Sequence, residues 1–331
     1  MYLDTAILDH YYLELDNGCI AVVTGNWHTE YCVVGYIKYC PTSKPTPWSR
    51  NGTFYERLVK TYSAKSVREH TGWSIYIPFF DSFVPCIPVH RVVKAWNPLA
   101  RTLDLTNKVR DELERRAIEA VMEISEYTGV LTGITGSLLP AIHNLQMSDM
   151  DFVIYGSYNS LKVVEYISDH KDTFKPLGGL SLAKWAEGAS QSTGLTVKEV
   201  LKFYRNWRRG ARNGKEYSII YNDGVHRDAL TLPTYRNDKP IKVIVELEGS
   251  LDALSYPSYS RVISWRSPKT ASRDVPHDIE GVLSYETVYM PALYEGGLFD
   301  IDGLLQCCEL TETCRVLLGG AEYRGTMKYY K

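Results

Sequence analysis

Hydrophobic and polar positions divide the chain into stretches of different period. Residues 1–105 carry short runs of β-branched and aromatic residues, at 19–24 and 31–37, separated by Asn-Gly and Gly-Asn pairs that are typical of turns. A Pro/Ser/Thr-rich segment at 40–48 and four further prolines between 78 and 98 argue against long helices. We therefore expect a β-rich N-terminal domain over 1–105.

A helical period begins after Asp104, with Thr106 or Asn107 as the expected N-cap. Its apolar positions are Val109, Leu113, Ala117, Ala120, Val121 and Ile124. The apolar run at 151–155, bounded by Gly156, predicts a strand.

A second apolar stripe at helical spacing predicts a helix with a basic opposite face. Its apolar positions are Val197, Val200, Leu201 and Tyr204. That face would carry Lys198, Lys202, Arg205, Arg208 and Arg209.

Strands return after residue 215, most clearly at 217–221 and 241–248. In the second, Val243, Val245 and Leu247 alternate with polar neighbours at a period of two. Short β-like runs continue at 281–289 and 315–318, so we expect a small β-domain at the C-terminus.

One segment carries recognisable chemistry: Gly136-Ser137 at a predicted strand-to-helix turn, followed by Asp149 and Asp151 at the start of a strand. Glycine allows close backbone approach to a phosphate, and the Ser137 hydroxyl adds a donor. The two aspartates are two residues apart on a strand, so both side chains point to the same face. Two adjacent carboxylates repel unless a cation joins them, and Mg²⁺ takes one or two carboxylates plus substrate phosphates.

This arrangement resembles the nucleotidyltransferase superfamily of DNA polymerase β, which is marked by Gly-Ser on a short helix and Asp-x-Asp on the next strand. The form Ser148–Gly156 looks closest to an uncharacterised archaeal group of predicted nucleotidyltransferases. The resemblance implies an α+β fold, in which a polymerase-β-like palm (a mixed sheet with flanking helices) occupies 106–258. A β-rich domain over 1–105 and a small β-domain over 259–331 would flank it.

The superfamily usually has a third carboxylate on a later strand. The candidates are Glu246 and Glu248, which share a strand face, with Asp228 as the runner-up. The resemblance thus implies Asp149, Asp151, Glu246 and Glu248 as catalytic residues. Among them, Asp149, Asp151 and Glu248 are the expected metal ligands. The alternative is that both glutamates are surface charges of an edge strand.

A nucleotide would be held by Gly136 and Ser137, helped by basic residues from 205–215. The expected basic contacts are Arg208, Arg209, Arg212 and Lys215. The same residues could grip a polynucleotide backbone or form a solvated helix face.

The resemblance implies Mg²⁺- or Mn²⁺-dependent transfer of a nucleoside monophosphate from an NTP to a hydroxyl, releasing pyrophosphate. The acceptor could be an RNA end, a protein side chain or a small molecule. The alternative is a catalytically silent nucleotide- or RNA-binding protein. A net charge of -2 does not favour a long polynucleotide.

No run of residues approaches the length of a membrane span, and the first residues do not form a signal peptide, so we expect a cytoplasmic protein without a membrane partner. The seven cysteines form no C-x-x-C pair and are expected mainly as buried thiols, with disulfides as the alternative. His143 is expected to be an ordinary polar or packing residue.

Overall fold

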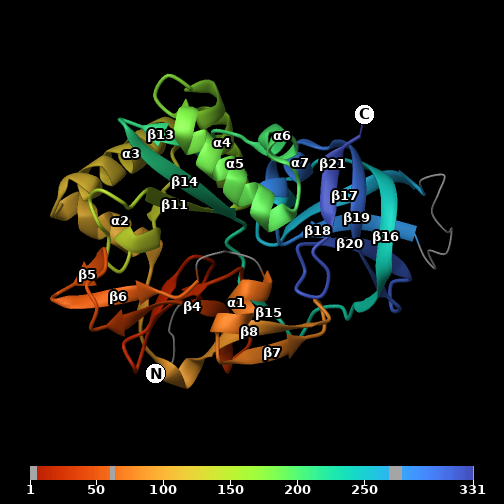
Figure 1. Cartoon of the computed structure of the whole chain (residues 1–331), viewed down its shortest axis with the longest axis horizontal. Coiled ribbons are helices and arrows are strands. Elements are labelled where there is room, and N and C mark those ends of the chain that lie inside the picture. Colours follow the sequence, from red (N-terminus) through yellow and green to blue (C-terminus); the bar gives the residue numbers. More distant parts are fainter. Residues whose placement is uncertain (1–5, 60–63, 268–277, 331) are drawn as a thin grey trace. The chain divides into compact units, whose positions relative to one another are not determined.

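The structure is a computed structural model that describes residues 6–59, 64–267 and 278–330. It is 28% helical and 39% strand. The chain folds into two compact units, each built from three separate segments (Figure 1). Unit 1 comprises 1–60, 86–178 and 205–227, and unit 2 comprises 61–85, 179–204 and 228–331. Neither unit coincides with one of the three predicted segments.

The N-terminal strands of unit 1 form a half-barrel sheet. Its neighbouring strands are, in order, β5 (Trp48–Arg50), β6 (Thr53–Arg57), β4 (Cys32–Thr42), β2 (Ile20–Val23), β1 (Tyr12–Leu15) and β9 (Val92–Trp96). The two-residue strand β3 (Trp27–His28) precedes β4, and the last residues of β8 (Ser82–Pro88) pair with β4. Every residue of β2 is buried, as expected for a strand covered on both faces.

Disulfides join neighbouring strands of this sheet. Cys19 bonds Cys40 and Cys32 bonds Cys86. A third disulfide, between Cys307 and Cys314, lies in unit 2 next to the buried free thiol of Cys308. The expectation of mainly buried thiols is therefore wrong, because strand pairing brings together cysteines that lie far apart in the sequence.

A mixed sheet completes unit 1, in the order β10-β11-β14-β13-β12. Its strands are β10 (Gly133–Ile134), β11 (Met150–Tyr155), β14 (Lys215–Asn222), β13 (Arg209–Arg212) and β12 (Lys175–Pro176). Strands β11 and β14 are parallel and the other pairs are antiparallel. The helices of the unit are α2 (Pro98–Asn107), α3 (Glu112–Thr128) and α4 (Ser157–Asp169).

The first predicted helix is two helices. Asn97 caps α2, with Pro98 at its first position, and α2 ends where an N-cap was expected. Asp111 caps α3 by accepting from the backbone N–H groups of Leu113 and Glu114, and α3 ends at Gly129 in the left-handed conformation.

Unit 2 contains a closed five-stranded β-barrel. Its strands follow one another as β16 (Arg236–Leu247), β17 (Ser258–Arg266), β18 (Asp278–Ser284), β20 (Thr313–Leu318) and β19 (Gly297–Cys308), and β19 pairs back onto β16. Other elements of this unit are α1 (Ala64–His70), β7 (Ser74–Ile77), α5 (Gly179–Thr193), α6 (Val197–Val200), α7 (Met290–Glu295) and β21 (Thr326–Tyr329). The short strand β15 (Arg227–Asp228) lies where the chain passes between the units.

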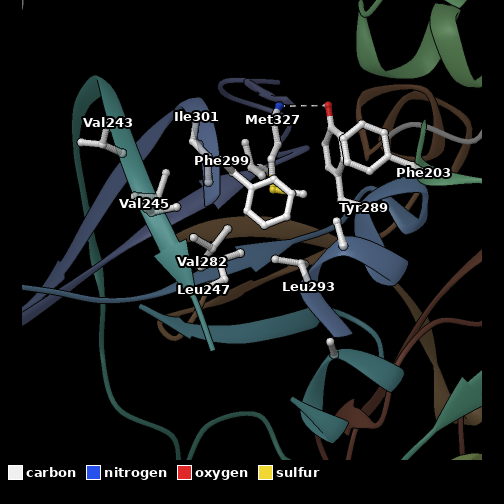
Figure 2. Close-up of a cluster of buried hydrophobic side chains, with 14 of the residues drawn as sticks. Phe203, Val243, Val245, Leu247, Val282, Tyr289, Leu293, Phe299, Ile301 and Met327 are labelled. Carbon is white, nitrogen blue, oxygen red and sulfur yellow. Dashed lines mark hydrogen bonds between the residues drawn. The ribbon is translucent and has the colours of Figure 1, made fainter. Parts of the chain in front are cut away.

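The barrel closes around an apolar core (Figure 2). Val243, Val245 and Leu247 are buried, so the predicted alternation along β16 is confirmed. They pack with Phe299 of β19 and with Tyr289, whose hydroxyl accepts from the backbone N–H of Met327 at 3.2 Å.

The predicted fold class is wrong. The chain is a β-rich protein with a half-barrel sheet and a closed barrel, and not a polymerase-β palm with flanking helices over 106–258. The reason lies in the strands that pair with β16. The prediction placed β16 itself in the palm. The strand β16 pairs with β17 and β19, whose residues lie up to 71 positions further along the chain (Arg236 pairs with Cys307), and its apolar face packs into the barrel core. Sequence periodicity cannot assign these pairings.

The predicted basic helix is also wrong. Helix α6 ends at Val200, a single 3₁₀ turn follows, and Arg209–Arg212 is strand β13. The turn between β13 and β14 explains this, because Asn213 and Gly214 both have positive φ, the conformation of a tight hairpin. Within the described residues, no helix is both long and apolar enough to cross a membrane.

Candidate functional site

Asp149 and Asp151 form a carboxylate pair at the start of β11 in unit 1. The negative charge of Asp151, together with burial, raises the pKa of Asp149 to about 6. Arg209 opposes this shift only in part. The pair therefore repels itself at neutral pH, which is the property expected of a site that accepts a cation.

The Gly136-Ser137 turn lies directly against Asp151. Gly136 has φ +64°, and a Cβ placed on it would stand 2.0 Å from Asp151 Oδ2. The backbone N–H of Thr135 donates to the carbonyl of Asp151 at 2.9 Å, and the Ser218 hydroxyl donates to Asp151 Oδ1. Only glycine satisfies both the conformation and the space at position 136.

Ser137 is held in place by a second serine. Its Oγ lies 3.2 Å from Ser148 Oγ, and Ser148 also accepts from the backbone N–H of Asn144 at 3.0 Å. Asn144 Oδ1 in turn accepts from the backbone N–H groups of Gln146 and Met147. The loop between Ser137 and Asp149 is thus organised by its own hydrogen bonds.

Three cationic side chains surround the pair. Arg209 Nη2 donates to Asp149 Oδ2 at 3.2 Å. Lys215 Nζ donates to the carbonyls of Leu145 and Gln146, and Lys215 and Asp149 interact electrostatically. The positive charge of Lys38, on β4, also acts to lower the pKa of Asp149.

Sequence reasoning missed Glu216. Its neighbour Tyr217 is the register partner of Met150, which follows Asp149, so Glu216 and Asp149 lie side by side on parallel strands. Arg209 Nη2 lies 3.5 Å from Glu216 Oε2 and bridges the two carboxylates. The signal was present in the sequence, because Glu216 and Ser218 share a strand face at a period of two.

Two other predicted nucleotide contacts, Arg208 and Arg212, have structural partners instead. Arg208 donates to the carbonyl of Ile219, and burial lowers its pKa to about 10. Arg212 forms an ion pair with Glu123 of α3. Of the predicted basic contacts, Arg209 and Lys215 are those that interact with Asp149.

The predicted third carboxylates belong to unit 2. Glu246 accepts from the Ser264 hydroxyl at 3.0 Å, and the backbone N–H of Glu248 donates to the carbonyl of Arg261. Asp228 accepts from the backbone N–H of Leu230. The site described here in unit 1 contains none of the three.

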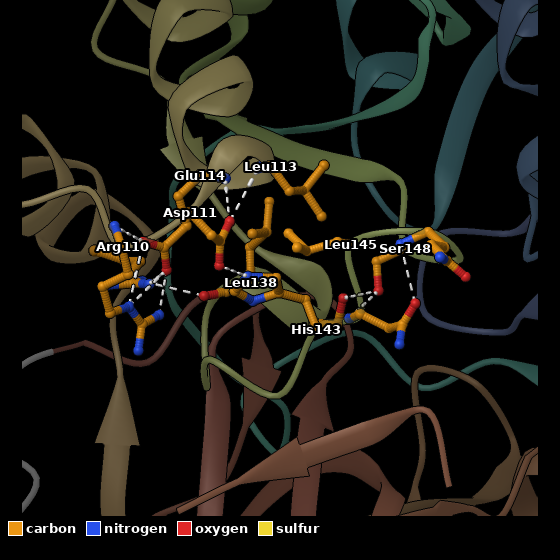
Figure 3. A network of polar contacts seen from close by, with 12 residues as sticks. Arg110, Asp111, Leu113, Glu114, Leu138, His143, Leu145 and Ser148 are labelled. Atoms are coloured by element: carbon orange, nitrogen blue, oxygen red, sulfur yellow. Dashed lines mark hydrogen bonds and ion pairs between the residues drawn. The ribbon is translucent and has the colours of Figure 1, made fainter.

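Asp111, Glu114 and His143 also gather in unit 1, with ligand atoms within 4.8 Å of one another (Figure 3). Glu114 is fully buried and forms ion pairs with Arg101 and Arg110, and these charges hold its pKa below its usual range although burial alone would raise it. His143 Nε2 lies 2.8 Å from Asp111 Oδ2, the second oxygen of the α3 N-cap. Every carboxylate here has internal partners, so the group serves as a helix cap, and the spacing of its ligand atoms would also allow a metal ion.

Comparison of the chain with models of known protein families, with curated proteins and with solved structures found no match.

Proposed function

We propose that unit 1 carries a divalent-cation-dependent nucleotidyltransferase site. The observation that carries the proposal is the self-repelling Asp149–Asp151 pair, packed against a Gly-Ser turn. Carboxylate oxygens are the ligands that Mg²⁺ and Mn²⁺ prefer, and Arg209 offsets only part of the repulsion that raises the pKa of Asp149. The donor set therefore fits such a cation, held by Asp149 and Asp151.

Each side chain has a part in this proposal. Ser137 and Lys215 would bind the triphosphate of an NTP, and Arg209 would exchange its bond to Asp149 for a phosphate oxygen. Glu216 would accept the proton of the attacking hydroxyl once Arg209 has moved. A bound cation would add charge that neutralises the phosphates and favours the leaving of pyrophosphate. The acceptor class is an RNA end, a protein side chain or a small molecule.

A second candidate function is a catalytically silent nucleotide- or RNA-binding protein. One observation favours it: Arg209 joins Asp149 to Glu216 and so partly neutralises the site without any cation. In that case NTP binding would not depend on a divalent cation, and no label would be transferred.

The test is incubation with each α-labelled NTP and Mg²⁺ or Mn²⁺, with total cellular RNA and protein as acceptors. We expect label to be transferred by the wild type and lost with Asp151→Asn, whose melting temperature should match the wild type. Glu216→Gln should slow transfer, while Glu165→Gln, an exposed change on α4, should not. NTP binding that is unaffected by EDTA, with no transfer, would replace this proposal with the second candidate.

A further inference from the structure

A hollow of about 550 Å³ opens between α3 and α4 in unit 1. Its wall includes Tyr127, Tyr166, Glu119, Glu123, Glu126 and Arg212. It is separate from the aspartate pair. Residues alternate faces along β13, so Arg209, which contacts Asp149, and Arg212, which lines the hollow, point to opposite faces of the mixed sheet.

An aromatic platform forms one side of the hollow. The Tyr127 ring stacks on the buried Tyr166 ring at 5.3 Å between centroids and 14° between planes, and Tyr166 packs on His170 at 4.2 Å. Tyr127 nevertheless remains 66% exposed, and Met122, which also lines the hollow, is 56% exposed. Tyr127 is therefore held rigidly from one side, with its remaining surface open to a ligand.

The charges around the platform are mainly negative. Glu123 forms an ion pair with Arg212, and Glu119 with Arg115. Glu126 is exposed and has no ion pair among the described residues. An unpaired carboxylate beside an open aromatic ring favours a cation, because the ring face and the carboxylate both attract positive charge.

The hollow also offers a donor. The Arg212 side chain is only 9% exposed, and its Nη1 is buried without a hydrogen-bond partner among the described residues. A buried guanidinium N–H without an acceptor is costly, so a ligand that brings a carbonyl oxygen would be favoured there.

We propose that this hollow binds a basic polypeptide segment, with an arginine or lysine side chain against Tyr127 and Glu126 and a backbone carbonyl at Arg212. A peptide is favoured over a free polyamine, which has no acceptor for Arg212. It is favoured over a nucleic acid, because Glu119, Glu123 and Glu126 would repel phosphates. The proposal does not depend on the nucleotidyltransferase activity.

The test uses the full chain and a fluorescein-labelled, acetylated tetra-arginine amide, followed by fluorescence anisotropy. We expect saturable binding that Tyr127→Ala or Glu126→Gln weakens about two- to fivefold, the range of an exposed cation–π or ion-pair contact. The matched controls are Tyr158→Ala and Glu165→Gln, which alter an exposed tyrosine and an exposed glutamate of α4 outside the hollow and should leave binding unchanged.

Two competitors sharpen the result. Spermine should compete more weakly than the unlabelled peptide, and an oligouridine should not compete. Equal competition by spermine, binding of the oligouridine at this site, or equal losses in the hollow and control variants would each overturn the proposal. Absence of peptide binding would also overturn it.

Discussion

Acidic side chains come together at two places in unit 1, the Asp149–Asp151 pair and the Asp111–Glu114–His143 group. The two places differ in how many internal donors each carboxylate has. Glu114 accepts from Arg101 and from the backbone and side chain of Arg110. Asp149 has one cationic donor, Arg209, and its neighbour Asp151 raises its pKa. Proximity of carboxylates is thus common to both, and the balance of internal donors separates a structural group from a candidate binding site.

Removing the charge of Glu114 gives the largest expected effect. Glu114→Gln leaves Arg101, whose side chain is 14% exposed, without its carboxylate partner. We expect a loss of about 3–5 kcal/mol in the free energy of unfolding, the usual cost of breaking a buried ion pair. Chemical denaturation measures it. The matched change Asp151→Asn should cost far less, and equal losses would contradict the comparison.

Gly136→Ala should have the next largest effect. Alanine at φ +64° is strained, and its Cβ would overlap Asp151 Oδ2. We expect a loss of about 2–4 kcal/mol, together with loss of NTP binding. Gly129→Ala is the control, because Gly129 has a similar φ of +70° but open space around its Cβ position. Equal effects of the two changes would show that contact with Asp151 is unimportant.

A change of charge at Asp149 should act in the opposite direction. Its folded pKa of about 6 lies above the usual 3.8, so the folded state binds the extra proton between these values. The contribution of this carboxyl to stability therefore falls as pH rises from about 4 to 6 and stays low above that. Asp149→Asn should stabilise the protein at about pH 8, by about 1 kcal/mol because solvent screens a side chain that is 37% exposed, and should have little effect near pH 4.

Denaturation of both proteins at the two pH values measures this difference. Arg209→Gln removes the ion-pair partner of Asp149, so it should destabilise by a similar amount at about pH 8 and serves as the opposing control. A destabilising Asp149→Asn at about pH 8 would show that Asp149 is satisfied internally.

Local patterns in the sequence predicted the positions of single elements. The alternation of Val243, Val245 and Leu247 predicted β16, and the apolar run after Asp149 predicted β11. The pair Asn213-Gly214 also favours a hairpin turn, and this signal was not used in the prediction. The local signals were sufficient wherever the nearest neighbours along the chain determine the conformation.

The fold and the full site depend on contacts between distant segments. Lys38 meets the aspartate pair only because the half-barrel and the mixed sheet fold into one unit, and β16 closes onto β19 across more than 50 residues. Glu216 becomes a neighbour of Asp149 only through the parallel pairing of β11 and β14. No periodicity within a single segment contains these pairings, which is why the palm was predicted wrongly.

The central claim is that a divalent cation binds at Asp149 and Asp151, and not at Asp111, Glu114 and His143. The most direct test is to titrate the protein with Mn²⁺ and to measure free Mn²⁺ by electron paramagnetic resonance. We predict weak binding that tightens when NTP is added, because phosphate oxygens complete the coordination shell. Asp151→Asn should abolish this binding and His143→Asn should leave it unchanged. Binding that survives Asp151→Asn and disappears with His143→Asn would contradict the claim.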